Sequence, residues 1–365
     1  MADDFGYHID HHGSLVRPPA LLAARASGMG GEALAAVQDE AVTALAHELR
    51  RLGLSACCDG QFRRSYFESV AHDQIAGFAP AGGPAPLSDL AGISAARRRA
   101  IPDAGALAAY GRLAQAEAAP VLATVDRSVF VTLPSPGYLA AAGSALADAS
   151  AIDAVRAAGA ALAAIVRDEI AALAADGVLY VALENPLYVP LLTADGRAAS
   201  AAAGIDVPAV LAALIEADRA VFAGLDAPAD FRVGLDLTDS GPLPLTSSGY
   251  DATAVAALLE ETPFPRIGID YPADPAARFP VELVKPGIVV SLGVVDVSTP
   301  AAESVEELLG RLDPVAEERG DADIAVATNG GFAQVADQPL MTAAEQRAKL
   351  RLVETVARYY WGNEI

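Results

Sequence analysis

His11-His12-Gly13-Ser14-Leu15-Val16-Arg17-Pro18 forms a polar turn near the start of the chain. The run before it, Phe5-Gly6-Tyr7-His8-Ile9, is short, aromatic and β-branched, which is typical of a strand. Gly13 lets the backbone leave this strand sharply, and Pro18 prevents the strand from continuing. The Ser14 hydroxyl and the Arg17 guanidinium at this exit suit a small anionic ligand, and a surface turn with incidental polar residues is the alternative.

The pattern of a strand followed by a helix repeats along the chain. Apolar residues recur at helical spacing over residues 33–52, and Gly53 follows as a C-cap. Residues 54–58 form the second predicted strand. Further strands are predicted at residues 129–133, 178–183, 231–237, 266–271, 287–295 and 324–327, and further helices at 152–176, from Asp206, at 251–261, from Ser304 and from Thr342.

These apolar runs show little alternation, which is typical of parallel strands buried on both faces. Eight strands that alternate with helices predict an α/β fold, a (β/α)8 TIM barrel. An open doubly wound sheet is the main alternative, but no G-x-G-x-x-G loop follows any strand.

The chain has 365 residues, more than the about 250 of a typical α/β barrel, which leaves room for an insertion. Proline and glycine with weak periodicity mark residues 78–120 as that insertion. We therefore predict one barrel over residues 1–365, with about 78–120 as an insertion or lid.

The charge balance restricts the partners. Lys and Arg number 25 against 47 Asp and Glu, and the formal net charge of −22 would repel nucleic acids and anionic membranes. No window approaches the about 20 uninterrupted apolar residues of a membrane span, and the N-terminus is acidic where a signal peptide would be basic. These features predict a cytoplasmic protein whose partner is a small molecule, with no nucleic acid and no membrane; a homodimer is compatible with them.

Cys57 and Cys58 are the two cysteines of the chain, and they are adjacent. Neighbouring cysteines do not close a loop through an ordinary disulfide, so a reducing compartment fits. A metal or redox site would need a second Cys or His pair, and we therefore predict buried structural thiols.

Active sites of TIM barrels lie at the C-terminal ends of the strands. The predicted strand exits would bring together one cup rich in acids and poor in bases, formed by Ser14, Gln61, Glu184, Asn185, Asp236, Asp239, Ser240, Asp270, Asp296 and Asn329.

Several short motifs in register resemble the catalytic domain of cobalamin-independent methionine synthase and its shorter single-barrel relatives. The resemblance covers nearly the whole chain. It is carried by the turn at 11–18, Asp59-Gly60-Gln61-Phe62-Arg63-Arg64, Glu184-Asn185-Pro186, Ser248-Gly249-Tyr250, Asn329-Gly330-Gly331-Phe332, and Gln346 with Lys349-Leu350 near Trp361-Gly362. It implies a methyltransferase-like enzyme on a barrel fold.

The resemblance implies a zinc ion that activates a thiol for methyl transfer from a folate. Its ligands would be a His-x-Cys pair after the fifth strand, an acid after the sixth and a Cys before Gly-Phe after the eighth. Here the fifth-strand segment Gly234–Ser240 holds neither His nor Cys, and Gly330 precedes Gly331-Phe332. Only Asp270 stands for the sixth-strand acid, so we expect no zinc and no methionine synthase activity as such.

The resemblance also implies an amino-acid pocket. In the family, acids at the positions of Gln61 and Glu184 bind the substrate's ammonium, and the Ser14 turn helps to bind its carboxylate. Gln61 removes one of these charges and Glu184 keeps the other, so recognition of an α-amino acid is weakened rather than lost.

Three hypotheses follow. We favour a zinc-free enzyme that acts on a small carboxylated or amino-bearing molecule by alkyl or methyl transfer or by acid–base chemistry. The alternatives are a folate-dependent methyltransferase without metal and a non-catalytic ligand-binding relative. The predicted proton-transfer groups are Glu184, Asp236 and Asp239, and the predicted substrate-binding residues are His11, Ser14, Arg17, Gln61, Asn185, Tyr250, Asp270 and Asn329.

His8, His11 and His12 surround Asp10 at the first strand exit and offer an alternative, His-based metal site. The resemblance places a histidine at this turn without making it a zinc ligand, so hydrogen bonding or substrate contact is the favoured role.

Overall fold

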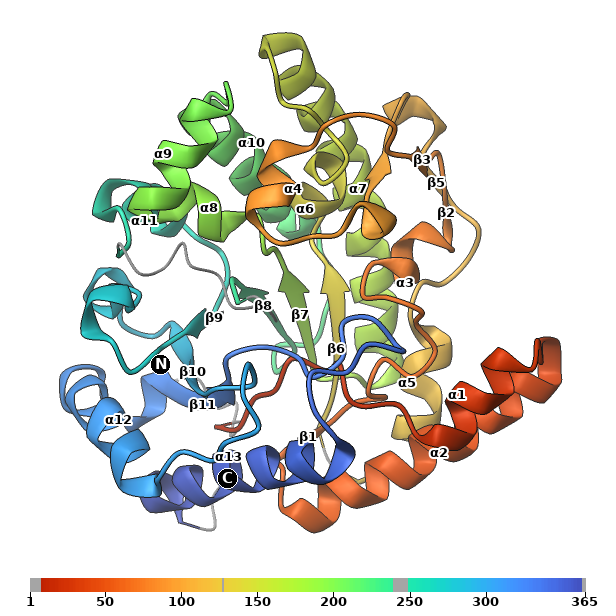
Figure 1. Cartoon of the computed structure of the whole chain (residues 1–365), viewed down its shortest axis with the longest axis vertical. Coiled ribbons are helices and arrows are strands. Elements are labelled where there is room, and N and C mark those ends of the chain that lie inside the picture. The colour runs from red at the N-terminus through yellow and green to blue at the C-terminus, as the bar shows by residue number, and fades with distance from the viewer. Residues whose placement is uncertain (1–7, 127, 239–248, 363–365) are drawn as a thin grey trace.

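A computed structural model describes residues 8–126, 128–238 and 249–362. Within these ranges, seven parallel strands form one curved sheet in chain order (Figure 1). They are β1 (Ala56–Cys57), β6 (Ser128–Pro134), β7 (Tyr180–Glu184), β8 (Arg232–Asp236), β9 (Arg266–Asp270), β10 (Val289–Val295) and β11 (Ile324–Thr328).

The first strand position lies beside the last strand. Ile9 forms a parallel bridge with Val326 of β11, and the Asp10 N–H donates to the Val326 carbonyl at 2.9 Å. This segment adds an eighth position to the sheet, in the chain order of a (β/α)8 barrel. The predicted fold class is confirmed.

The strands are buried on both faces, as their unbroken apolar runs predict. Every residue of β7, β10 and β11 is buried. Because both faces are covered, the polar residues gather at the strand ends rather than along the strands.

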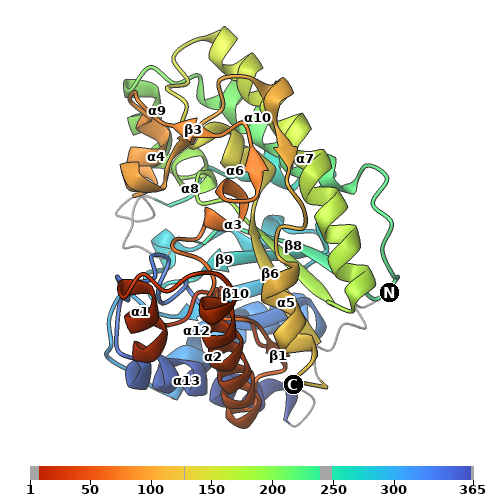
Figure 2. The same cartoon turned by 90° about the vertical axis from the view of Figure 1, so that its right-hand side faces the viewer.

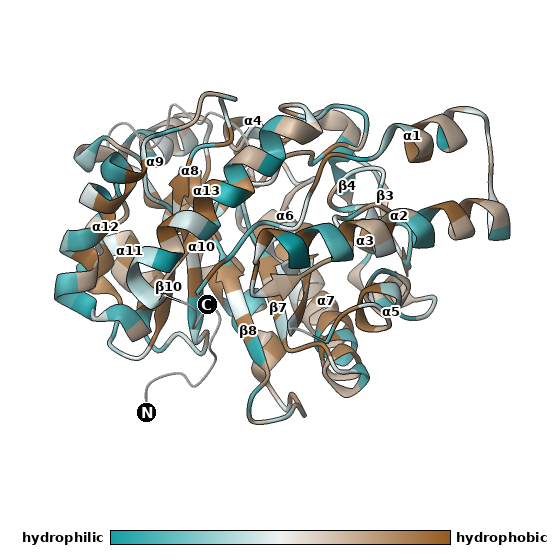
Figure 3. Ribbon diagram, turned by 90° about the horizontal axis from the view of Figure 1, so that it is seen from below, coloured by the Kyte–Doolittle hydropathy of each residue, from teal (hydrophilic) through white to brown (hydrophobic). Residues whose placement is uncertain are grey.

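Helices follow the strands and cover the outside of the sheet (Figure 2). The longer ones are α2 (Gly31–Leu52), α7 (Ala149–Asp176), α10 (Val207–Arg219), α12 (Val305–Arg319) and α13 (Ala343–Trp361), and the shorter ones are α1 (Pro19–Ala26), α3 (Ser69–His72), α5 (Gln115–Leu122), α6 (Pro136–Ala141), α8 (Tyr188–Leu192), α9 (Ala194–Ala202) and α11 (Ala252–Leu259). Figure 3 shows hydrophilic and hydrophobic residues mixed along the covering helices, as expected for helices with one face on the core.

The predicted helix ends agree with the structure. Gly53 ends α2 with φ +85°, a conformation that glycine adopts without strain. Asp206 caps α10 by accepting from the Ala209 N–H at 3.1 Å. Ser304 and Thr342 each form a capping box at the start of α12 and α13.

Residues 75–109 depart from the alternation of strand and helix. β2 (Ile75–Ala76) pairs antiparallel with β5 (Ala108–Ala109), and β3 (Ala79–Pro80) pairs with β4 (Arg99–Ala100), with the short helix α4 (Pro86–Leu90) between β3 and β4. This excursion overlaps the predicted insertion at 78–120, whereas α5 beyond it packs with α2 and β6. Its role as a lid stays a prediction.

Within the described ranges, one helix, α7, is long and apolar enough to span a membrane by length and composition. Its buried residues pack against α6 and α10 of the outer layer. This packing is what a covering helix of a barrel requires.

Candidate active site

The predicted site residues gather at the C-terminal ends of the strands. Glu184, Asp236 and Asp270 are the last residues of β7, β8 and β9. His11 and His12 follow the first strand position, and Gln61 follows β1. Asp239 and Ser240 lie outside the described residues.

His12 and Asp236 form a buried ion pair. Nδ1 of His12 lies 2.5 Å from Oδ2 of Asp236, and Nε2 lies 2.7 Å from the carbonyl oxygen of Thr328. The second carboxylate oxygen of Asp236 accepts from the Thr238 N–H at 2.8 Å. The Thr238 hydroxyl lies 3.0 Å from Nδ1 of His12. The ends of two strands, β8 and β11, thus hold one imidazole ring.

These contacts set the charges of the pair. Burial by itself lowers the pKa of His12, but Asp236, Glu184 and Asp10 outweigh it and raise the pKa to about 10. Burial raises the pKa of Asp236, but His12 and the bonds from Thr238 bring it below its usual value. At neutral pH His12 is therefore an imidazolium and Asp236 a carboxylate.

Glu184 has the opposite protonation state. Its side chain is buried, and Oε1 has no hydrogen-bond partner among the described residues. Burial and the charge of Asp236 raise the pKa of Glu184 to about 8, although His12 and Arg64 oppose the shift. Glu184 is therefore mostly protonated at neutral pH.

His11 is a neutral neighbour of this cluster. Its ring lies edge-on to Phe130, with 4.8 Å between ring centroids, and is 2% exposed. Burial and the charge of His12 lower its pKa to about 3. Neither ring nitrogen has a partner within the described chain, so this imidazole has one donor and one acceptor to offer a ligand.

The turns around Ser14 and Gln61 meet at the same place. Nε2 of Gln61 donates to the Thr132 hydroxyl at 2.9 Å, while Oε1 finds no partner among the described residues. The Ser14 carbonyl accepts from the Phe332 N–H at 2.8 Å. A Cβ on Gly331 would lie 1.9 Å from the Ser14 hydroxyl oxygen, so only glycine allows this approach of the two loops.

Two of the predicted ligand-binding residues have hydrogen-bond partners within the protein. Arg17 is buried and donates to the carbonyls of Leu15, Ala333 and Gln61 at 2.6–2.9 Å. Asn185 is fully buried; it donates to Asp218 and accepts from the backbone of the following turn. These contacts favour a framework role for both residues over the predicted contact with a ligand, because side chains already bonded in this way have few groups left to offer.

Tyr250 also lies in a packed position. Its ring packs against Phe279 at 5.1 Å between centroids, and its backbone bridges Thr193. Burial and the charge of Asp270 raise its pKa. Tyr250 is thus near Asp270 rather than a member of the His12 cluster.

Asp270 and Asn329 line a pocket of about 490 Å³ beside the cluster, together with Asp296, Glu303, Glu307 and Arg311. Burial and Asp296 raise the pKa of Asp270 to about 7, while Asn329 and His12 oppose the shift. The side chain of Asn329 accepts from the Val297 N–H at 2.9 Å, which fixes the pocket wall.

Sequence reasoning favoured hydrogen bonding or substrate contact for the histidines of the first turn, but it did not list His12 among the substrate-binding residues and it missed Thr238. In the sequence, His12 lies in the turn after the first predicted strand, and Asp236 lies at the end of the fifth. Both turns are expected at the same end of a barrel. Arg64 was also missed; it forms a buried pair with Glu117 at 2.7 Å and donates to the Thr132 carbonyl. Its positive charge acts on Glu184.

The residues at the implied zinc positions do not fit a zinc ion. Leu235 and Leu237 are buried and apolar, Gly330 has no side chain, and residues 234–248 contain neither His nor Cys. Within the described ranges no three His, Cys, Asp or Glu side chains are grouped to hold a metal. Cys57 and Cys58 are buried free thiols, and the Cys58 sulfur accepts from the Gly60 N–H.

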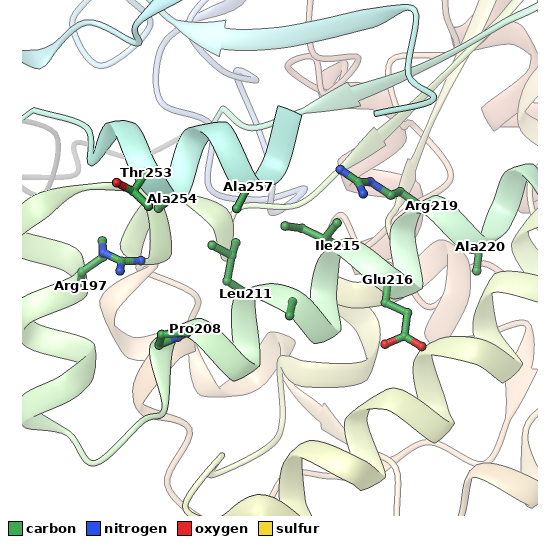
Figure 4. A pocket seen from close by; sticks show the side chains of 11 residues that line it. Arg197, Pro208, Leu211, Ile215, Glu216, Arg219, Ala220, Thr253, Ala254 and Ala257 are labelled. Atoms are coloured by element: carbon green, nitrogen blue, oxygen red, sulfur yellow. The ribbon is translucent and has the colours of Figure 1, made fainter. Parts of the chain in front are cut away.

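A larger groove of about 730 Å³ lies away from the strand ends, between α10 and α11 (Figure 4). Leu211, Ile215 and Ala257 form its apolar floor, and Arg197 and Arg219 stand at its rim. No buried polar atom without a partner is found among its lining residues, all of which the structure describes. The acid-rich strand ends are therefore the candidate site.

No family model matches this chain. It is 25% identical to the uncharacterized protein YxjH of Bacillus subtilis over a 373-residue alignment, which covers 97% of this chain and 95% of the relative.

Two solved structures share the fold over most of their length. One, from Listeria monocytogenes, is provisionally described as a vitamin B12-independent methionine synthase (TM-score 0.66, 18% identity, 98% of each chain). The other is a B12-independent methionine synthase from Shewanella sp. W3-18-1 in complex with selenomethionine (TM-score 0.69, 15% identity, 90% of this chain and 89% of that one). The fold is thus that of cobalamin-independent methionine synthase-like proteins, as the sequence motifs predict.

Proposed function

We propose that this chain is a methionine-synthase-like enzyme that works without zinc on a small molecule bearing an amino and a carboxyl group. Alkyl or methyl transfer, or proton transfer, is the proposed reaction. The shared fold supports this proposal, and so does the selenomethionine bound by the Shewanella protein, because Ser14 and Glu184 stand where the sequence resemblance places an amino-acid pocket.

The observation that carries the proposal is the pair of buried acids in opposite protonation states. Asp236 is held as a carboxylate by His12, and Glu184 is held protonated by burial and by Asp236. Two titratable groups whose environments separate their pKa values are the mark of assigned acid and base roles. Glu184 also has one carboxyl oxygen, Oε1, without a hydrogen-bond partner among the described residues, so this oxygen is available to a ligand.

Each residue then has a role. Glu184 is a proton-transfer group: it releases its proton to solvent when the ligand's ammonium group binds, and its carboxylate then accepts a hydrogen bond from that ammonium. Asp236 is the fixed anionic acceptor, and His11 donates a hydrogen bond from a neutral imidazole to a ligand oxygen. Ser14 and Gln61 orient the ligand's carboxyl end. Asp239 is the third proposed proton-transfer group, and Asp270 and Asn329 are proposed to contact the far end of the ligand.

The zinc-free reaction is part of the proposal. It is supported by the leucines and the glycine at the implied ligand positions, since neither type coordinates a metal through its side chain. The methyl donor of the alternative, a folate, would need a methyl acceptor that is nucleophilic without a metal.

Calorimetry with L-methionine and L-selenomethionine tests the proposal. We expect the wild type to bind and to release a proton at pH 7, which appears as a dependence of the heat on the buffer's ionisation enthalpy. Glu184→Gln should weaken binding about ten- to a hundredfold and abolish the proton release, because a charge-assisted hydrogen bond is lost. Glu216→Gln, on the exposed side of α10, is the matched control and should bind as the wild type does.

Normal binding by Glu184→Gln, or no binding by the wild type, would overturn the proposal. Incubation of the wild type with homocysteine and a folate that carries a labelled methyl group separates the two reaction classes. Label in the amino-acid product would establish the folate-dependent alternative.

A further inference from the structure

The ring of His12 lies among several buried acids. Asp236, Glu184 and Asp10 all act electrostatically on it, and His12 acts in turn on Asp270. The neighbouring imidazole of His11 adds no charge, because burial and the charge of His12 lower its pKa to about 3. A protein that buries several carboxyl groups together needs a compensating positive charge.

Geometry fixes the charge of this ring. The Thr328 carbonyl at 2.7 Å only accepts, so Nε2 of His12 carries a proton. At 2.5 Å, Oδ2 of Asp236 accepts from Nδ1, while Oδ1 already accepts from the Thr238 N–H. A ring that donates from both nitrogens is an imidazolium.

The ring also lies at a particular set of strand ends. Asp236 and Thr238 belong to the end of β8, and Thr328 is the last residue of β11. The sequence resemblance implies zinc ligands after the fifth and eighth strands, which are β8 and β11. This chain has no such ligands there. Instead, the imidazolium of His12 is held at the same strand ends by Asp236 and the Thr328 carbonyl.

We propose that His12 is a built-in cation that supplies the positive charge a metal would otherwise bring to this cup, and that it positions Asp236 as an ionised acceptor for substrate. This inference rests on the proposed zinc-free function. Both N–H groups of His12 are used within the protein, so the ring acts on substrate through Asp236 and is a positioning residue.

The first test reads the charge of the ring directly. Nitrogen-15 NMR of the full-length chain, with the His12 signals assigned by their absence in His12→Gln, should show both nitrogens protonated from pH 6 to 9. A neutral tautomer of His12 at pH 7 would overturn the inference.

The second test replaces the ring. His12→Gly should be destabilised and should regain several degrees of melting temperature with imidazole at pH 6.5, but not with 1,2,4-triazole, in which N1 and N4 are placed as the two nitrogens of imidazole are and which stays neutral. His11→Gly is the matched control from the same turn: there the native ring is neutral, so triazole and imidazole should restore stability alike. Equal rescue of His12→Gly by both rings would show that shape alone matters.

A variant that keeps the volume covers the case in which His12→Gly does not fold. His12→Gln removes the charge, and carbon-13 NMR should then show the pKa of Asp236 rising above its wild-type value. An unchanged titration of Asp236 contradicts the inference. None of these measurements uses substrate. If His12 is neutral but amino acids bind, only this inference is wrong. If His12 is charged but amino acids do not bind, only the proposed function is wrong.

Discussion

At the scale of the residue, Gln61 shows how one side chain alters the pocket. Sequence resemblance implies an acid here, and the amide instead donates to Thr132 and leaves Oε1 without a partner among the described residues. Its backbone has a φ of +57°, unusual for a residue other than glycine, so the turn holds the side chain in one place at some cost in strain.

Gln61→Glu should therefore improve the binding of amino-acid ligands. The second carboxylate would face the ligand's ammonium together with Glu184, and each charge-assisted bond contributes about 1.5–3 kcal/mol. The same charge is buried when no ligand is present, so the melting temperature of the free protein should fall.

Calorimetry with L-methionine and thermal unfolding with and without ligand check both effects. The isosteric Gln38→Glu, on the covering helix α2, serves as a control for a buried charge added away from the strand ends. If Gln61→Glu gains no affinity, the inherited pocket is not the working site.

At the scale of the element, one buried ion pair fastens the excursion at residues 75–109 to the barrel. Arg97 donates to Glu68 at 2.6 and 3.0 Å, and Glu68 also accepts from the Tyr138 hydroxyl of α6. The Glu68 carboxylate is 1% exposed, and Arg97 holds its pKa below the usual value against the effect of burial. The excursion is therefore anchored by a buried ion pair in addition to apolar contacts, to which Leu87 and Ile93 contribute.

Glu68→Gln should loosen this excursion. The variant leaves Arg97 without its charge partner, which we expect to cost about 1.5–3 kcal/mol because the bonds to a charged group are lost. Hydrogen exchange should show faster exchange over residues 75–109 and little change in β7 or β10. Asp89→Asn is the control in the same segment: its pair with Arg98 is exposed on the Asp89 side and should contribute at most about 1 kcal/mol. Equal effects of the two variants would contradict the anchoring role of Glu68.

At the scale of the whole molecule, the charge balance works against compactness. The chain carries a formal net charge of −22, and several acids are buried at one end of the barrel. Screening acts over about 30 Å at 0.01 M salt and about 8 Å at 0.15 M, so salt weakens this repulsion between surface carboxylates.

The midpoint of thermal unfolding should accordingly rise between 0.01 and 0.15 M NaCl at pH 7.5. The expected rise is about 1–2 °C for each kcal/mol of repulsion removed, because the entropy of unfolding grows with chain length. Scanning calorimetry measures it, and the same scan with an uncharged osmolyte at matched osmolarity is the control. A fall of the midpoint with NaCl would mean that attractive ion pairs outweigh the net repulsion.

The sequence by itself determined the order of the elements. Apolar runs placed β6, β7 and β10 to within a few residues, because strands buried on both faces consist mainly of apolar side chains. The ends of α2 and α12 could be predicted as well, since a left-handed glycine and a capping box act within a few residues of the chain.

Only the tertiary structure decided which polar groups face one another. His12 and Asp236 are far apart in the chain, and their contact depends on how the first strand position and β8 meet in the barrel. Arg17 was expected at a ligand, yet the carbonyls that surround it belong to three different segments. The opposite protonation of Glu184 and Asp236 likewise comes from burial and from neighbouring charges, which are properties of a position in space and not of a motif.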